Sequence, residues 1–348
     1  MGRRWLFVGL SAGFFVAAGV AHYAKATDVL TFGLSTVALA GLAWTVSFAT
    51  EQVGERFGPG VTGVMQSTLG NLPEFFVVLF ALSAGEVVVA ETSIVGSVFA
   101  NALLVLGAVI LVGCGPTEDG VMRFSVRLPK DNAILMMLTS FLIVILGIST
   151  ATGDKASHHI EAISIFGAVA LLATYLVWVV DYLRTDTAAE PSHTEPVMSM
   201  SGALILLALG GVGAAFVSDW FIGALAPTMD RLGIPEAFAG LVIVAIAGNA
   251  VENFTGIVLA KKGQADLAIS VVKNSVAQIT AFLYPALVLV SLFFATRLTF
   301  ALPPVLIAAL LLTGLALWMI TSDGEATRFE GVALIAFYGI LAVAVWYE

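Results

Sequence analysis

Two short segments of the chain carry the same polar pattern within apolar surroundings. Gly70-Asn71-Leu72-Pro73-Glu74 and Gly248-Asn249-Ala250-Val251-Glu252 each place an Asn three residues before a Glu. Residues at i and i+3 share one face of a helix, so each amide is expected to lie beside a carboxylate. A carboxylate deep in an apolar span is costly and is generally functional. Asn71, Glu74, Asn249 and Glu252 are therefore candidate ligands.

The residue types in these blocks suit a hard cation and protons. Carboxylates, amide oxygens and backbone carbonyls freed by Gly and Pro form an anionic, all-oxygen set, and Ca²⁺ prefers about 6–8 oxygen ligands. Neither His nor Cys accompanies the blocks, which argues against zinc or copper. Burial without a cation favours the protonated carboxyl, so cations and protons would compete for Glu74 and Glu252. This competition predicts antiport; the alternative is a pair of structural glutamates.

A shift of 178 residues places the second block on the first, and the identity continues beyond the blocks. The further identities, without a gap, are at Phe76, Gly85, Ala90, Ser97, Val98, Ala108 and Leu111-Val112. Chance similarity between apolar helices is the alternative, but it does not account for two Gly-Asn-x-x-Glu blocks. The chain therefore contains an internal repeat.

The composition defines what must position these residues. Hydrophobic residues make up 59% of the 348 residues and charged residues 11%, with a net charge of −9. Soluble domains carry about 25% charged residues, so a disordered chain or an ordinary soluble enzyme is excluded. The acidic balance argues against nucleic-acid partners. The single cysteine, Cys114, allows neither an intrachain disulfide nor a thiolate cluster.

The hydropathy pattern predicts an all-α integral membrane protein, because a span needs about 20 apolar residues. Eleven segments qualify: residues 5–22, 29–50, 61–83, 88–113, 132–150, 160–183, 200–222, 236–260, 267–295, 301–321 and 329–347. None of the connections is long enough for a soluble domain. The function must then lie between helices of one membrane domain.

Positive charge predicts the orientation in a prokaryote-like cell membrane. With a cytoplasmic N-terminus, the inner connections hold ten Lys and Arg and the outer ones four. Eleven spans then place the C-terminus outside. The first span has an alternative interpretation as a signal peptide, because Arg3-Arg4 and an apolar run precede Ala24-Lys25-Ala26. Its apolar run is longer than that of a typical signal peptide.

The span count also predicts that the two repeats are inverted. The copies begin in the third and eighth spans, which are five spans apart and so enter the membrane from opposite sides. Inverted repeats build secondary transporters with a site near the midplane. The expected organisation is an extra N-terminal helix (1–27), a first five-helix repeat (28–183), a cytoplasmic linker (184–199) and a second five-helix repeat (200–348).

Further polar residues have two interpretations each. Ser97 and Asn101 on the fourth span, and Ser275 and Gln278 on the ninth, either support the site or hydrogen-bond neighbouring helices. Glu51 and Glu55, and likewise Glu86 and Glu91 in the predicted outer connection, either attract cations to a mouth or are solvated helix ends. Lys273 either neutralises a nearby Glu or has a structural role, and we favour the structural role.

Taken together, these residues resemble the calcium/cation–proton exchanger (CAX) family of the cation/Ca²⁺ exchanger superfamily. The resemblance covers residues 40–113 and 210–295. It is carried by Ala49-Thr50-Glu51, both Gly-Asn-x-x-Glu blocks, Gly96-Ser97, Asn101, Ser218-Asp219-Trp220-Phe221 and Ser275-Val276-Ala277-Gln278. Asn after the Gly favours the proton-coupled branch, because the related sodium–calcium exchangers have Ser or Thr there.

The resemblance implies export of Ca²⁺ in exchange for H⁺, with no bound cofactor and Ca²⁺ as the transported substrate. It implies that Glu74 and Glu252 bind the cation and protons and that Asn71 and Asn249 shape the site. It implies a polar pathway lined by Glu51, Ser97, Ser275 and Gln278. Four positions depart from the family pattern: Gln66, Ala245, Asn253 and Lys273-Asn274.

Several alternatives stay open at this point. The departures leave Ca²⁺ against Mn²⁺ selectivity and Na⁺ coupling undecided, and the sequence does not distinguish a monomer from a homo-oligomer. An intramembrane metalloenzyme is disfavoured because the His residues lie at loops and span ends, with no H-E-x-x-H pattern. An ion channel is disfavoured because the chain carries its own two-fold repeat rather than depending on several subunits.

Overall fold

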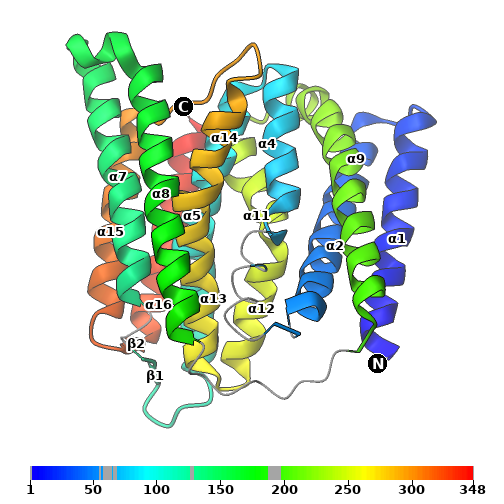
Figure 1. The fold of residues 1–348 in the computed structure, drawn as a ribbon, viewed down its shortest axis with the longest axis horizontal. Helices are drawn as coiled ribbons and strands as arrows, with labels where there is room; N and C mark the ends of the chain where they lie inside the picture. The colour runs from blue at the N-terminus through cyan, green and yellow to red at the C-terminus, as the bar shows by residue number, and fades with distance from the viewer. Residues whose placement is uncertain are drawn as a thin grey trace.

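The computed structural model describes residues 2–54, 56–57, 65, 69–125, 129–186 and 197–347. Long helices run side by side in one bundle, and a two-stranded sheet lies at one end (Figure 1). We call this end the sheet end. The N-terminus lies at the sheet end and the C-terminus at the opposite end (Figure 1). The helical prediction is confirmed.

Within the described residues, nine helices are long and apolar enough to cross a membrane. They are α1 (Gly2–Tyr23), α2 (Asp28–Gly54), α5–η1–α6 (Val87–Phe99, Ala100–Val105, Leu106–Gly113), α7 (Pro129–Thr152), η2–α8 (Lys155–His159, Ile160–Asp186), α9 (Met200–Leu232), α13–η4–α14 (Ala265–Gln278, Ile279–Leu283, Tyr284–Ser291), α15 (Pro304–Thr321) and α16 (Arg328–Trp346). Shorter helices are α4 (Leu72–Ala84) and α10–η3–α11 (Glu236–Phe238, Ala239–Val244, Ala245–Gly248), which is followed by α12 (Ala250–Lys261). Most of the predicted third span lies outside the described residues, so the count of eleven stays a prediction.

The first helix packs into the bundle as the other spans do. The Ser11 hydroxyl of α1 donates to the carbonyl oxygen of Gly41 in α2 at 2.8 Å. The ring of Phe15 lies 5.5 Å from that of Trp220 in α9. These contacts fit the interpretation of this segment as a membrane helix.

Two helices begin in the interior of the bundle, each directly after an Asn. Asn71 (φ −84°, ψ 7°) precedes α4, and Asn249 (φ −99°, ψ 14°) separates α11 from α12. From these starts, α4 runs away from the sheet end and α12 runs towards it (Figure 1). Pro73 lies in the first turn of α4, whereas the second break forms without a proline. The loss of Pro at Ala245 therefore does not abolish the second break.

The helix bounds repeat along the chain as the sequence does. With the shift of 178 residues, α4, α5, η1 and α6 coincide with α12, α13, η4 and α14 to within one residue at each end. Gly85 and Gly263 end α4 and α12, and both have a positive φ (84° and 73°) that favours glycine. The π-helical segments η1 and η4 also coincide, and such segments are frequent at functional sites.

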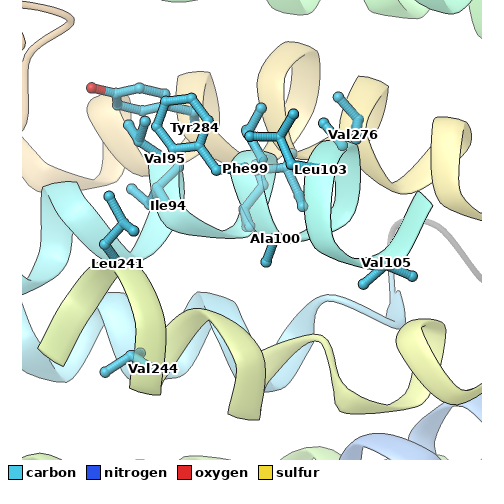
Figure 2. Packing of buried hydrophobic residues seen from close by; sticks show 14 of the residues in the cluster. Ile94, Val95, Phe99, Ala100, Leu103, Val105, Leu241, Val244, Val276 and Tyr284 are labelled. Carbon is cyan, nitrogen blue, oxygen red and sulfur yellow. The ribbon is translucent and has the colours of Figure 1, made fainter. Parts of the chain in front are cut away.

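The two continuous repeat helices form the centre of the bundle. In α5–η1–α6 and α13–η4–α14, 83% and 72% of the apolar window is buried, against 17–44% in the other seven spans. Side chains of Ile94, Val95 and Phe99 lie near Leu241 of η3 and Tyr284 of α14 (Figure 2). This contact fixes α5 between the segments that carry the second block.

Glycines allow α5 and η3 to approach closely. A Cβ added to Gly96 would lie 2.5 Å from the Cα of Leu241, and one added to Gly240 would lie 2.8 Å from the carbonyl oxygen of Val89. Small residues allow such contacts between membrane helices.

A short sheet joins two connections that the sequence analysis treats as loops. β1 (Val121–Arg123) pairs antiparallel with β2 (Glu325–Thr327), with Met122 opposite Ala326. Arg123 forms ion pairs with Asp119 at 2.6 Å and with Glu325 at 3.1 Å. The all-α prediction misses these strands, because three residues are too short to show a periodic pattern.

Candidate functional site

Glu74 lies in the interior of the bundle, in the first turn of α4. It is 3% exposed, and its Oε1 accepts a hydrogen bond from the hydroxyl of Ser97 in α5. As the third residue of α4, its carboxylate lies at a helix N-terminus, where the unpaired N–H groups stabilise negative charge. The break before α4 thus places a carboxylate in the apolar interior with a polar environment of its own.

The second sequence block contacts this carboxylate through Asn249. Its Nδ2 donates to the Ser97 hydroxyl at 2.7 Å and to the carbonyl oxygen of Ala245 at 2.9 Å. Gly248 packs close to Glu74, because a Cβ added to it would lie 3.7 Å from the Cβ of Glu74. The two blocks, 178 residues apart, therefore face each other, as the sequence predicts.

Asn101 completes a buried polar network from both halves of the chain. Its Nδ2 donates to the Oδ1 of Asn249 and to the carbonyl oxygen of Ser97, both at 3.0 Å. Asn101, Ser97 and Asn249 are all fully buried. The Oδ1 of Asn101 accepts no hydrogen bond from the described residues. We call the connected side chains of Glu74, Ser97, Asn101 and Asn249 the Glu74 network.

The remaining residues of the two blocks flank this network. Gly70 is half-buried in the turn before α4, and Asn71 is buried at the helix start without capping it. Glu252 is the third residue of α12, the position that Glu74 has in α4. The side chain of Glu252 lies outside the part of the structure that is described, so its place in the site stays a prediction.

The second repeat also buries the counterparts on α13. Ser275, which matches Ser97 at the 178-residue shift, is 3% exposed, and its hydroxyl makes no hydrogen bond to a described residue. Gln278 is buried nearby in the same helix. The described contacts do not bring either side chain into the Glu74 network.

Glu51 lies apart from the network, at the sheet end of α2. Its side chain is 38% exposed, and its Oε1 lies 4.0 Å from the Nη2 of Arg4. Glu55 and Gln66 fall outside the described residues. The Nζ of Lys273 donates to the hydroxyl of Thr321 at 2.7 Å and, among the described residues, pairs with no carboxylate.

The acidic residues at the other end differ from the prediction. Glu91, expected in an outer connection, is the fifth residue of α5 and is partly buried, because α5 begins at Val87. Glu86 does precede the helix. Burial, followed by the negative charges of Glu236 and Asp230, raises the pKa of Glu86.

The donor set suits a hard cation more than a soft one. Around Glu74 the network offers carboxylate, hydroxyl and amide oxygens. The described residues contain no group of three or more His, Cys, Asp and Glu side chains that could hold a metal ion. Sequence reasoning named all four residues of the network but did not predict the direct bond between Asn101 and Asn249.

The chain matches the family model described as "Sodium/calcium exchanger protein" twice, over residues 27–181 and 202–347. These two matches cover most of the sequence. The chain therefore belongs to the sodium/calcium exchanger protein family.

Characterised relatives match along nearly the whole chain. The Ca(2+)/H(+) antiporter ChaA of Bacillus subtilis is 30% identical over 352 residues, which cover 98% of each chain. The Ca(2+)/H(+) antiporter of Synechocystis is 29% identical and covers 94% of each. The vacuolar calcium ion transporter of Schizosaccharomyces pombe is also 29% identical, covering 91% of this chain and 79% of its own.

Solved structures share the fold. The structure of native YfkE superimposes with a TM-score of 0.82 at 25% identity, covering 99% of this chain and 100% of that one. The H+/Ca2+ exchanger CAX gives a TM-score of 0.76 at 16% identity and covers 99% and 92%. The sodium-calcium exchanger NCX_Mj shares the fold more distantly, with a TM-score of 0.57.

Proposed function

We propose that this protein is a secondary antiporter that exchanges Ca²⁺ for H⁺ across the membrane in which it resides. One observation carries the proposal: a buried carboxylate, Glu74, is hydrogen-bonded to Ser97 and linked through it to Asn249 of the second block. Relatives named as Ca²⁺/H⁺ antiporters, aligned over nearly the whole chain, support it. This function makes the protein a transporter rather than an enzyme.

In this mechanism, Glu74 and Glu252 bind either the cation or protons. Glu74, Asn101 and Asn249 supply oxygens of the kind that Ca²⁺ prefers. When the cation leaves, the carboxylates are buried without a counter-charge, so protonation stabilises the empty site. The Ser97 hydroxyl donates to Glu74 while the site is empty and can rotate to offer its oxygen to a cation. Each species thus displaces the other, which is the basis of exchange.

We also propose that two inverted five-helix repeats, with an additional first helix and eleven spans in all, provide alternating access. The recurring helix bounds support this arrangement, as do termini at opposite ends of the bundle. The two family-model matches, at 27–181 and 202–347, lie close to the expected repeats 28–183 and 200–348. The first helix (1–27) and the linker (184–199) lie outside them. Charge bias places the sheet end in the cytoplasm.

The test is ⁴⁵Ca²⁺ uptake into proteoliposomes, with and without an imposed pH gradient, in Na⁺-free buffer. We expect uptake to depend on the gradient and to fall to the level of empty liposomes in Glu74→Gln and in Glu252→Gln. Glu118→Gln changes an exposed loop carboxylate and is the matched control. Full transport by either site variant would contradict the site assignment. Uptake that requires Na⁺ would instead favour sodium coupling, and competition by Mn²⁺ in the same assay measures selectivity.

A further inference from the structure

A groove of about 690 Å³ opens on the bundle surface between α7, α13 and α15. Its walls are apolar over most of their length. Met137 of α7 and Leu311 and Trp318 of α15 are 70%, 50% and 66% exposed, so this side of the groove faces the lipid. The groove is separate from the Glu74 network, and the exchange mechanism does not use it.

One end of this groove is polar and positively charged. Lys273, Thr321 and Ser322 line it, and the Nζ of Lys273 donates to the Thr321 hydroxyl at 2.7 Å. An ammonium has three donors, so further hydrogen bonds can be made. No ion pair joins Lys273 to a carboxylate in the described part of the chain. A cation within a span generally pairs with an anion, which here must come from outside the described residues.

The length and direction of the groove match one lipid leaflet. Thr321 is the last residue of α15, next to the sheet end, and Leu310 lies eleven residues earlier in the same helix. At about 1.5 Å per residue, the groove extends ~16 Å along α15. Half of a hydrocarbon core of about 30 Å is ~15 Å. The charged end therefore lies at the depth of the headgroups and the apolar end near the midplane.

A glycine keeps the floor of the groove open. A Cβ added to Gly314 would come no closer than 3.9 Å to Met136, so there is free space above this position. The far wall includes Val276 of α13 and Ala102 of η1. These two elements also carry Ser275 and Asn101, so an occupant of the groove would contact the helices beside the candidate site.

We propose that this groove binds an anionic glycerophospholipid from the leaflet at the sheet end. The phosphate contacts the Lys273 ammonium and the hydroxyls of Thr321 and Ser322, and one acyl chain lies along α15 over Gly314. Charge complementarity selects the anionic headgroup, and the apolar length selects a lipid over a free phosphate. This site stands whether or not the proposed exchange activity is confirmed.

Native mass spectrometry of the full-length protein in detergent tests the proposal. The protein is titrated with phosphatidylglycerol or with phosphatidylcholine of the same acyl chains. We expect tighter binding of phosphatidylglycerol, and Lys273→Gln should reduce that preference about fivefold, equivalent to the ~1 kcal/mol of one basic residue near anionic lipid. Lys273→Arg should retain the preference. Lys262→Gln, at an exposed lysine after α12, should leave it unchanged.

A second pair of variants tests the acyl-chain part of the site. Gly314→Leu should reduce binding of both lipids, whereas Gly339→Leu, at an exposed glycine of α16 with free space around it, should not. Glycerol phosphate, which has no acyl chains, should not compete. Equal binding of the two lipids by the unaltered protein, or an unchanged preference in Lys273→Gln, would overturn the proposal. Those two measurements decide it even if Gly314→Leu does not fold.

Discussion

Ser97 occupies the centre of the Glu74 network, because its hydroxyl donates to Glu74 and accepts from Asn249. A hydroxyl can do both at once, whereas an amide nitrogen or a carboxylate cannot. The side chain is also small enough to lie fully buried between α4 and the break after α11. Ser97 therefore connects the proton-binding carboxylate to the opposite sequence block.

Replacing Ser97 should weaken exchange without abolishing it. Ser97→Ala removes the donor to Glu74, and a hydrogen bond to a charged group contributes about 1.5–3 kcal/mol. We expect the KM for Ca²⁺ in proteoliposomes to rise about tenfold or more, since ~1.4 kcal/mol corresponds to a factor of ten. Ser97→Thr should retain most activity. Ser83→Ala, which removes a hydroxyl bonded only within α4, is the control. An unchanged KM in Ser97→Ala would show that this bond is not part of the binding site.

The raised pKa of Glu86 has a consequence for stability. Burial and the charges of Glu236 and Asp230 raise it above the ordinary value of 4.5. The folded state then binds the proton more tightly than the unfolded state, so ionisation destabilises the fold as pH rises above about 4.5. Glu86→Gln removes that ionisation. In detergent, we expect its Tm to exceed that of the unaltered protein at pH 7, with the difference shrinking as pH falls towards 4.5. Glu118→Gln should show no such trend, and a Tm difference that grows on acidification would refute the assigned direction.

At the scale of helices, the site depends on two interruptions and one close crossing. Most helix bounds follow from apolar length, so the sequence predicts them well. It also indicates the breaks, since Gly and Asn precede each Glu. The π-helical segments η1 and η4 are different, because their i→i+5 bonding leaves no recognised residue pattern in α5 or α13. The same holds for Gly96 and Gly240, whose importance appears only when α5 lies against η3.

The α5–η3 crossing should not accept a larger residue at Gly96. In Gly96→Ala the new Cβ would lie 2.5 Å from the Cα of Leu241, so a helix backbone must move. Overpacking of this kind costs about 1–3 kcal/mol. We expect a lower Tm in detergent and reduced exchange, because the shift displaces Ser97 from Glu74. Gly339→Ala places a methyl group in free space and should match the unaltered protein. A Tm equal to that control would mean that the helices are less tightly packed than described.

At the scale of the whole molecule, the sequence predicts which residues meet but not how. The 178-residue repeat correctly places Asn249 beside the Glu74 region, because the two blocks occupy equivalent positions. It does not predict that Asn101, which has Ile279 at its equivalent position, bonds Asn249 across the repeats. Asymmetric pairings like this depend on the packing of both halves, which no local pattern encodes. The lipid-facing groove at Lys273 likewise arises only when three separate spans assemble.

Inversion of the repeats can be tested at two equivalent, exposed positions. Ser83 and Lys261 are 178 residues apart, near the ends of α4 and α12, which run from the site towards opposite ends of the bundle (Figure 1). With buried Cys114 replaced by Ala, each position is changed to Cys in intact cells and treated with a membrane-impermeant maleimide. We expect Ser83→Cys to react from outside and Lys261→Cys only after permeabilisation. Reaction of both from one side would exclude inversion. The reverse accessibility would retain inversion but require an external N-terminus, because a two-fold repeat fixes the relative direction of its halves while positive charge alone sets the absolute one.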